Sequence, residues 1–145
     1  MLANEYFKDF RFRSFYIEDE MVCRMLVLFF QCSDSGWVSL SIDEGVLTWT
    51  YEKTEPELRD IKDIDDEFAW PVQTANELAS YVGKKITDIY EYKLEGIEEG
   101  SIGVYFECGN KGFSVLEHEG CLFLFDGVYY VAQGKILLSR LALSI

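Results

Sequence analysis

Short apolar runs separated by polar turns dominate the chain, and one succession of them occurs twice. Residues 28–49 read LFFQCSDSGWVSLSIDEGVLTW, and residues 104–124 read VYFECGNKGFSVLEHEGCLFL. Each has an apolar run, a polar turn ending in Gly, an apolar-rich run, an Asp/Glu-Gly turn and another apolar run. This succession is typical of a three-stranded meander. We therefore predict a β scaffold built from two similar halves.

The two stretches can be aligned residue by residue. A shift of 76 positions gives these pairs: Phe30 with Phe106, Cys32 with Cys108, Gly36 with Gly112, Trp37 with Phe113 and Leu40 with Leu116. After a one-residue deletion the pairing continues as Glu44 with Glu119, Gly45 with Gly120 and Leu47 with Leu122. Two copies are too few for a solenoid, which needs about three. The halves, about 22–52 and 86–132, would form one continuous sheet or two packed ones within a single domain, 1–145.

The segment 52–73 interrupts the strand pattern. Thr54 and Glu57 have the spacing of a capping box, which opens a helix. The residues that follow have helical periodicity, with an apolar face and an acidic face as follows: Leu58, Ile61, Ile64 and Phe68 against Asp60, Asp63, Asp66 and Glu67. This pattern predicts a short amphipathic helix with an acidic outer face. A structured loop is the alternative.

A second helix is predicted between the halves. Thr74 and Glu77 form another capping box, and Gly83 is well placed to end the helix after residue 82. The expected fold class is therefore α+β: a mainly antiparallel sheet from two similar β-meander halves, with one or two short helices between them.

The two ends of the chain are less clearly patterned. From Phe10 the sequence F-R-F-R alternates as an edge strand would, and a short helix over residues 4–9 is an equal alternative. The pair Asp126-Gly127 predicts a hairpin turn into VYYVA. The tail, KILLSRLALSI, fits a helix or a strand equally well.

Length and composition indicate a globular chain. The 145 residues are 49% hydrophobic and 16% aromatic, with only two prolines, which excludes a disordered chain. The longest wholly apolar run, Met25 to Phe30, is far shorter than the ~20 residues that span a bilayer. The charged N-terminal stretch lacks the apolar region of an export signal. We expect no membrane association.

Four cysteines are distributed without a CxxC pair, at positions 23, 32, 108 and 121. Free cysteine is among the most buried residue types, so we expect structural thiols that fill small core spaces. A disulfide or a zinc site is the alternative, and the presence of a single histidine argues against zinc. Reduced thiols would agree with a cytoplasmic protein.

Catalytic signatures are sparse. The common hydrolase, nucleotide-binding and zinc-protease motifs are absent from the sequence, and we expect neither enzymatic activity nor a cofactor or metal. The only histidine, His118, is expected to face solvent from a strand. Glu107 and Glu117 could supply the paired carboxylates of a sugar-acting site. A pocket where these three residues converge would favour a small-ligand or sugar-acting protein.

The net charge of −13 is unevenly placed. Residues 52–67 hold eight acids against three bases, and residues 88–99 hold five against one. Such a field repels nucleic acid and anionic lipid and favours a cationic partner, with simple solubility as the alternative. The partner-binding residues predicted on this basis are Glu57, Asp60, Asp63, Asp66, Glu67, Trp70, Glu91, Glu95, Glu98 and Glu99. We expect a monomer or a weak dimer.

The segment LASYVGKKITDIYEY, followed by GSIGVYFECGNKGFSVLEHEG, resembles small bacterial immunity proteins of polymorphic toxin and contact-dependent growth inhibition systems. The resemblance covers roughly residues 78–125 and consists of a helix, a GKKI, a strand and a hairpin. It implies a short acidic α+β protein that neutralises one toxin domain. Immunity proteins bind their toxins through differing surfaces, so the resemblance assigns no site residues.

The leading hypothesis is a non-enzymatic inhibitor that docks an acidic face on a basic toxin domain, such as a nuclease with a Lys- and Arg-lined groove. Complementary charge would speed encounter, and aromatic anchors inside the acidic rim would supply lasting affinity. The alternatives are a protein-interaction module without a toxin, or a protein that binds a sugar or another small ligand.

Overall fold

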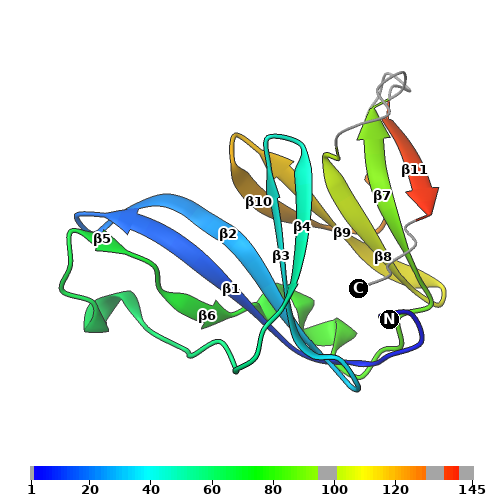
Figure 1. Cartoon of the computed structure of the whole chain (residues 1–145), viewed down its shortest axis with the longest axis horizontal. Coiled ribbons are helices and arrows are strands. Elements are labelled where there is room, and N and C mark those ends of the chain that lie inside the picture. The colour runs from blue at the N-terminus through cyan, green and yellow to red at the C-terminus, as the bar shows by residue number, and fades with distance from the viewer. Residues whose placement is uncertain (1, 95–100, 130–135, 141–145) are drawn as a thin grey trace.

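Two antiparallel sheets make up the fold, which is known from a computed structural model that describes residues 2–94, 101–129 and 136–140 (Figure 1). The strands of the first sheet are β1 (Phe7–Ile17), β2 (Glu20–Cys32), β3 (Gly36–Asp43), β4 (Val46–Tyr51), β5 (Phe68–Ala69) and β6 (Val72–Thr74). Those of the second are β7 (Asp88–Leu94), β8 (Gly103–Cys108), β9 (Lys111–His118), β10 (Cys121–Asp126) and β11 (Ile136–Arg140).

Helix is a minor part of the structure. Two 3-10 helices, η1 (Ile61–Asp63) and η2 (Asn76–Tyr81), are the only ones among the described residues. Neither has the length or apolar character needed to cross a membrane. The protein is therefore mostly antiparallel β, with less helix than the α+β class predicted from the sequence.

The two halves share one strand order. It is β4-β3-β2-β1 in the first sheet and β10-β9-β8-β7 in the second, with neighbouring strands antiparallel. The predicted meanders thus correspond to β2–β3–β4 and β8–β9–β10. In both, the second and third strands are joined by the same tight turn, Glu44-Gly45 or Glu119-Gly120, with positive φ at all four residues. Such angles belong to the two-residue hairpin turn whose twist matches the flanking strands.

The one-residue deletion lies in the first turn of the second meander, earlier than the sequence alignment places it. Cys32 pairs with Gly36 across three residues, whereas Cys108 pairs with Lys111 across two. β3 and β9 therefore correspond at a shift of 75. The sequence alignment is wrong for three pairs as a result: Gly36 with Gly112, Trp37 with Phe113 and Leu40 with Leu116.

Gly36 and Gly112 serve different purposes. Gly36 has a φ of +73° at the end of a turn, a conformation that glycine adopts without strain. Gly112 lies inside β9 under the ring of Tyr105, where a Cβ atom would come within 2.4 Å of the Tyr105 hydroxyl oxygen. The sequence alignment therefore paired two glycines that the fold requires for different reasons.

The segment 52–73 is a structured loop, and the amphipathic helix predicted there is wrong. Only the single turn η1 forms, with Asp60 accepting a hydrogen bond from the backbone N–H of Lys62. Arg59 and Val72 exchange two backbone hydrogen bonds. This pairing fixes the segment as a loop that folds back on itself, and a helix from the Thr54–Glu57 capping box cannot coexist with it. Of the predicted apolar face, Leu58 and Phe68 are exposed.

The second predicted helix is shorter and of a different type. Thr74 is the last residue of β6, which pairs with β1, so it does not cap a helix. η2 follows Ala75, which makes no side-chain capping bond, and Glu77 forms an ion pair with Arg24 at 2.8 Å instead. The expected stop is confirmed, because η2 ends at Tyr81 and Gly83 has a φ of +86°.

The chain ends also differ from the sequence-based expectations. β1 is an interior strand with β2 on one side and β5 and β6 on the other, so neither the edge strand nor a helix over residues 4–9 is right. The tail forms β11 beside β7, and residues 141–145 lie outside the described part. β10 ends at Asp126, and the second strand of the hairpin predicted there, VYYVA, lies partly outside the described residues, among which β10 pairs with β9 alone.

A cluster of buried phenylalanine rings joins the two sheets. Phe7 and Phe10 of β1 and Phe30 of β2 meet Phe106 of β8 and Phe113 of β9. The ring centroid of Phe7 lies 4.7 Å from that of Phe10 and 5.7 Å from each of the other three. Burying one such side chain contributes roughly 1.5 to 3 kcal/mol. The two sheets therefore share a single core.

A disulfide connects the sheets at a second place, which corrects the expectation of four free thiols. Cys23 of β2 is bonded to Cys121 of β10, with their Cα atoms 5.8 Å apart and a sequence separation of 98. Cys32 and Cys108 are free and buried, as expected for structural thiols. The argument for a cytoplasmic location from reduced thiols therefore does not hold for Cys23 and Cys121.

We predict that reduction of the Cys23–Cys121 bond lowers the free energy of unfolding by about 3 to 5 kcal/mol, because the bond closes a long loop in the unfolded chain. Urea unfolding with and without reductant measures the difference. The Cys23→Ser/Cys121→Ser variant is the control and should not respond to reductant. Equal stability of the native protein in both conditions would contradict the pairing.

Candidate functional site

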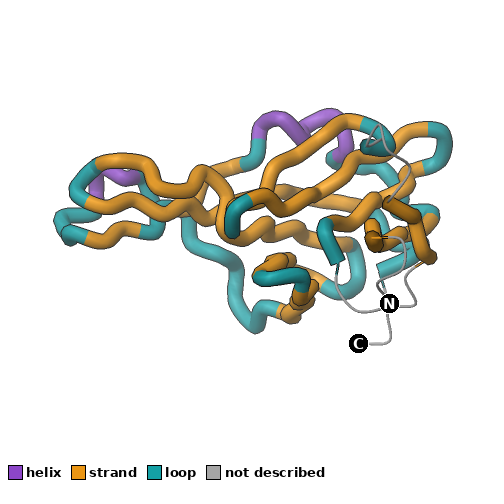
Figure 2. The backbone as a smooth tube through the Cα atoms, turned by 90° about the horizontal axis from the view of Figure 1, so that it is seen from above, coloured by secondary structure: helices purple, strands orange, loops and turns teal. Residues whose placement is uncertain are grey.

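One end of the first sheet projects from the body of the protein as an arm (Figures 1 and 2). We define the arm as residues 13–22, the outer part of the β1–β2 hairpin, together with residues 57–72, which run beside it. β5 pairs with β1 at Tyr16 and Ile17, next to the hairpin turn. The two segments of the arm are therefore joined by backbone hydrogen bonds close to its tip.

Three aromatic rings stack on the arm. The Phe15 ring centroid lies 6.3 Å from that of Phe68 and 5.3 Å from that of Trp70, with interplanar angles of 13° and 21°. Phe68 and Trp70 nevertheless keep 48% and 49% of their surface exposed. Stacking contributes roughly 0.5 to 1.5 kcal/mol per pair beyond burial and holds the rings in place. The arm thus presents an ordered aromatic surface to solvent.

Exposed apolar side chains are concentrated on the arm. Of the eleven exposed large hydrophobic residues in the described part of the chain, five belong to the arm: Met21, Val22, Leu58, Phe68 and Trp70. Trp70 also lines a hollow of about 500 Å³ with Arg13, Glu57, Arg59 and Val72. Single exposed apolar residues are normal, whereas a group of them with a polar rim is typical of an interaction surface.

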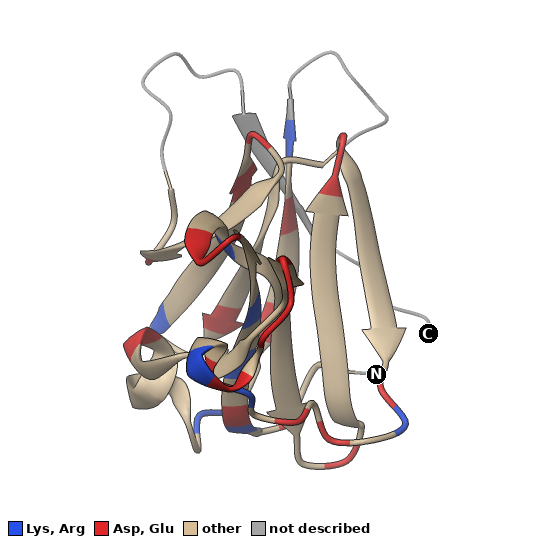
Figure 3. Ribbon diagram, turned by 90° about the vertical axis from the view of Figure 1, so that its left-hand side faces the viewer, with Lys and Arg blue, Asp and Glu red and all other residues tan. Residues whose placement is uncertain are grey.

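Acidic side chains outnumber basic ones on the arm. Nine exposed carboxylates lie on the arm: Glu18, Asp19, Glu20, Glu57, Asp60, Asp63, Asp65, Asp66 and Glu67. Three basic residues accompany them: Arg13, Arg59 and Lys62. Figure 3, which views the molecule from the arm end, shows acidic segments around the hairpin and the loop beside it. The arm as a whole therefore carries a net negative charge, although two arginines and one glutamate line the hollow beside Trp70.

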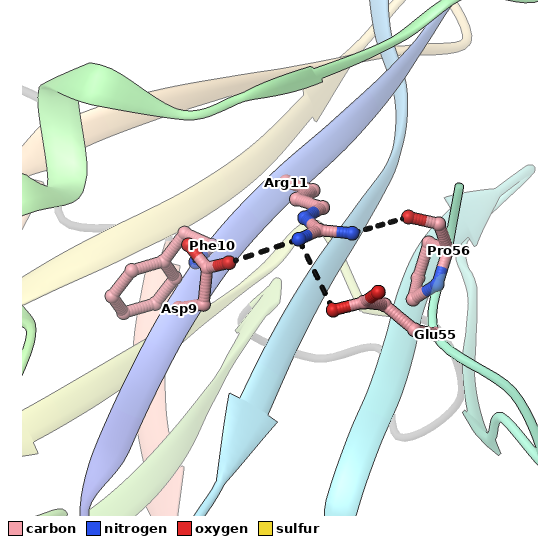
Figure 4. A network of polar contacts seen from close by, with 5 residues as sticks. All are labelled: Asp9, Phe10, Arg11, Glu55 and Pro56. Carbon is pink, nitrogen blue, oxygen red and sulfur yellow. Dashed lines mark hydrogen bonds and ion pairs between the residues drawn. The ribbon is translucent and has the colours of Figure 1, made fainter. Parts of the chain in front are cut away.

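Arg11 fastens the start of the acidic segment to the body (Figure 4). Its guanidinium donates to the carbonyl oxygen of Pro56 at 2.6 Å and to Glu55 Oε1 at 3.2 Å, and lies 3.4 Å from Asp9 Oδ2. It also covers the Trp37 ring at 4.8 Å. Arg11 is only 9% exposed, and its Nε has no hydrogen-bond partner among the described residues. The contacts of the buried Arg11 guanidinium with Glu55 and Pro56 therefore fix the position where the acidic segment leaves the body.

The structure separates the predicted partner-binding residues into two groups. Six lie on the arm and are exposed: Glu57, Asp60, Asp63, Asp66, Glu67 and Trp70. Glu91 lies on β7 of the second sheet, where its side chain is 15% exposed and its carboxylate is 4.0 Å from Lys93 Nζ. The side chains of Glu95, Glu98 and Glu99 lie outside the described residues. The arm is therefore the surface on which the predicted residues come together.

The candidates for catalytic chemistry do not converge. Glu107 is opposite Gly112 in the β8–β9 register, and Glu117 lies five residues further along β9, about 16 Å away at the usual rise per residue. His118 ends β9 with its side chain exposed, as expected. Among the described residues, Glu107 therefore lies too far from Glu117 and His118 for these three side chains to line one sugar-acting or small-ligand pocket.

The free thiols are poor nucleophiles. Burial is the main cause that raises the pKa of Cys32 to about 12, and the carboxylate of Glu5 adds to it. Burial likewise raises the pKa of Cys108 to about 11. Only the thiolate is reactive, and it is scarce at neutral pH for such values. In the part of the chain that the structure describes, no three His, Cys, Asp or Glu side chains are grouped to hold a metal ion.

Two features of this surface are missed by the sequence reasoning. Phe15 is the central ring of the stack, and Arg11 is the anchor of the acidic segment. The F-R-F-R alternation does indicate that Arg11 and Phe12 face opposite sides of a strand. It does not indicate that Arg11 is buried, because that depends on residues 55 and 56, which are more than forty positions away.

Comparison of the chain with protein-family models, with curated proteins and with solved structures finds no match in any of the three.

We predict that Arg11→Met loosens the acidic segment. The substitution keeps much of the apolar volume but removes hydrogen bonds from a charged donor, which contribute roughly 1.5 to 3 kcal/mol. Amide hydrogen exchange of residues 53–59 should quicken, and stability should fall by about that amount. Glu55→Gln is the control, because this exposed partner should contribute less than about 1 kcal/mol. Equal exchange in the two variants would contradict the role given to Arg11.

Proposed function

We propose that the protein is a non-enzymatic binding protein that docks the acidic and aromatic surface of its arm on a basic partner protein. The observation that carries the proposal is the ordered stack of Phe15, Phe68 and Trp70 on the acidic arm, with Phe68 and Trp70 about half exposed. Aromatic residues that stay exposed cost solvation free energy, and an interface would bury them.

The two components of the surface have different physical roles. The carboxylates act at long range, attracting a basic partner and orienting its approach. The rings act after contact, because burying large aromatic side chains in a partner's pocket slows dissociation. Because the arm is held by β5, by the Arg59–Val72 pairing and by Arg11, little conformational entropy should be lost on binding.

The partner that we propose is a cognate toxin domain with a basic surface, such as a nuclease, and the protein would be its immunity protein. The resemblance in residues 78–125 supports a toxin domain as the partner. The acidic arm supports a basic surface on that domain. A projecting arm could enter a substrate groove lined by Lys and Arg and exclude nucleic acid from it. We propose the cytoplasm as the site of action, where reducing conditions would open the Cys23–Cys121 bond.

The decisive experiment is co-expression with the basic C-terminal domain encoded by the neighbouring gene. We expect that domain to inhibit growth when expressed alone and to become harmless when this protein is present. Purified together, the two should form a complex. If the neighbouring gene encodes no such domain, or the domain stays toxic in the presence of this protein, the immunity role is wrong.

We predict that reversing the charge of Asp60, Asp63, Asp66 and Glu67 to Lys lowers the association rate with that basic domain by about tenfold or more at low salt. The loss should shrink as salt rises, because screening acts beyond about 8 to 10 Å. Stopped-flow binding at two salt concentrations measures both effects.

A matched control separates the arm from the overall charge. The acids Asp34, Asp43, Glu44 and Glu119 are exposed on turns of the body, so reversing them changes the net charge by the same amount. This control should slow association less than the arm variant. Equal rates for the two variants would mean that the arm has no special role in encounter.

We predict that Trp70→Ala acts on dissociation. Because the ring is half exposed, the substitution should cost about 1 to 2 kcal/mol of stability through the lost Phe15 stacking and burial. The association rate should hardly change, while the dissociation rate should rise about tenfold or more. Tyr51→Ala, at an exposed aromatic of the body, is the control. A dissociation rate unchanged by Trp70→Ala would remove Trp70 from the interface.

A further inference from the structure

In the part of the chain that the structure describes, β10 forms one edge of the second sheet and pairs only with β9. Cys121 and His118 flank a two-residue turn and pair with each other, so they form a hydrogen-bonded pair, and such pairs alternate along the ladder. Gly127 N–H donates a hydrogen bond to the Gly112 carbonyl oxygen at 2.7 Å. Gly127 lies an even number of residues after Cys121, so this bond agrees with the same alternation. Leu122, Leu124 and Asp126 therefore direct their N–H and C=O groups away from β9. Among the described residues, no hydrogen bond to these outward groups occurs.

A groove of about 450 Å³ lies along this edge. Its walls come from β10 on one side and from η2 and β2 on the other, and the lining side chains that matter here are Leu78, Tyr81, Phe113, Leu122 and Leu124. The ring centroids of Tyr81 and Phe113 are 4.8 Å apart, with the rings tilted by 59°, and both residues belong to the core. In the groove, the core between the two sheets thus reaches solvent beside the outer edge of β10.

Polar groups mark different parts of the groove. Arg24 and Glu77 form their 2.8 Å ion pair across β2 and η2, so their charges largely offset each other. The exposed residue Asp126 ends β10, and one of its carboxylate oxygens accepts a hydrogen bond from the Tyr81 hydroxyl. Burial first, and this bond second, raise the pKa of Tyr81. The side chains that line the groove therefore have a net charge of −1, carried by Asp126, while Lys111 Nζ lies over the Tyr81 ring, 4.6 Å from its centroid.

We propose that β10 and this groove bind an extended peptide segment of a partner protein, which adds a strand to the second sheet. The outward groups of Leu122, Leu124 and Asp126 would hydrogen-bond its backbone, and every second side chain would enter the apolar groove. A Lys or Arg of the segment would lie against Asp126. Strand addition suits this edge because β10 contains neither proline nor lysine, the residues that commonly protect edges.

The proposal does not depend on the arm, because the groove is formed by other residues and either surface could bind alone. A library of random twelve-residue displayed peptides, selected on the intact protein, provides the probe. We expect the enriched peptides to carry apolar residues at every second position and a basic residue near one end. Nuclear magnetic resonance should show their largest amide shifts at Leu122, Leu124 and Asp126.

Two variants of Leu124 isolate the contribution of the backbone. Leu124→Ala shortens the side chain and keeps the outward N–H, whereas Leu124→Pro removes that N–H at a position that does not bond to β9. Leu124→Pro should weaken binding about tenfold more than Leu124→Ala, the effect of a lost hydrogen bond or two. Methylating the backbone nitrogens of the selected peptide gives the same test without altering the protein. Asp126→Asn should weaken the binding of peptides that contain a basic residue.

The outcomes distinguish the proposal from other kinds of binding. If no peptide is enriched, or the shifts map to another surface, the groove is not a strand-binding site. If methylated and unmodified peptides bind equally well, then side chains alone are recognised and strand addition is wrong.

Discussion

The packing of Phe7 between the two sheets is the contact on which the rest of the structure depends. Its ring touches Phe10, Phe30, Phe106 and Phe113, and its backbone exchanges hydrogen bonds with the chain leaving η2, at Gly83 and Lys84. One residue at the start of β1 thus fixes both halves and the segment that links them. A smaller side chain there would leave a cavity at the centre of the core, which typically costs about 3 to 5 kcal/mol.

The arm follows from this arrangement through strand length. β1 and β2 have 11 and 13 residues, while β3 and β4 have 8 and 6. Because the core holds β1 at its first residues, the excess length of the hairpin extends beyond the body. Among the described residues only 57–72 cover the hairpin there, so the aromatic side chains of both segments stay partly exposed. The Cys23–Cys121 bond lies near the base of the arm and limits how far it can swing.

The strands and turns were predictable because their signals are local. The Glu-Gly turns require positive φ, and the glycine in each pair indicates such a turn in the sequence. The helices were not predictable, since Thr74 has a capping-box neighbour in Glu77 yet pairs with Arg11 in the sheet, where tertiary contacts override local preference. Exposure of the acids was predictable from charge alone. The placement of Trp70 was not, because it depends on the register of the β1–β2 hairpin and on β5.

The negative charge and the free strand edge have a physical connection. An unpaired edge such as β10 can join the same edge of a second copy and lead to aggregation. With a net charge of −13, two copies repel each other at long range, so the charge protects an edge that has little local protection. The same field attracts a basic segment. Discrimination between a second copy and a basic partner could therefore come from net charge, which leaves the backbone groups of β10 free to bind.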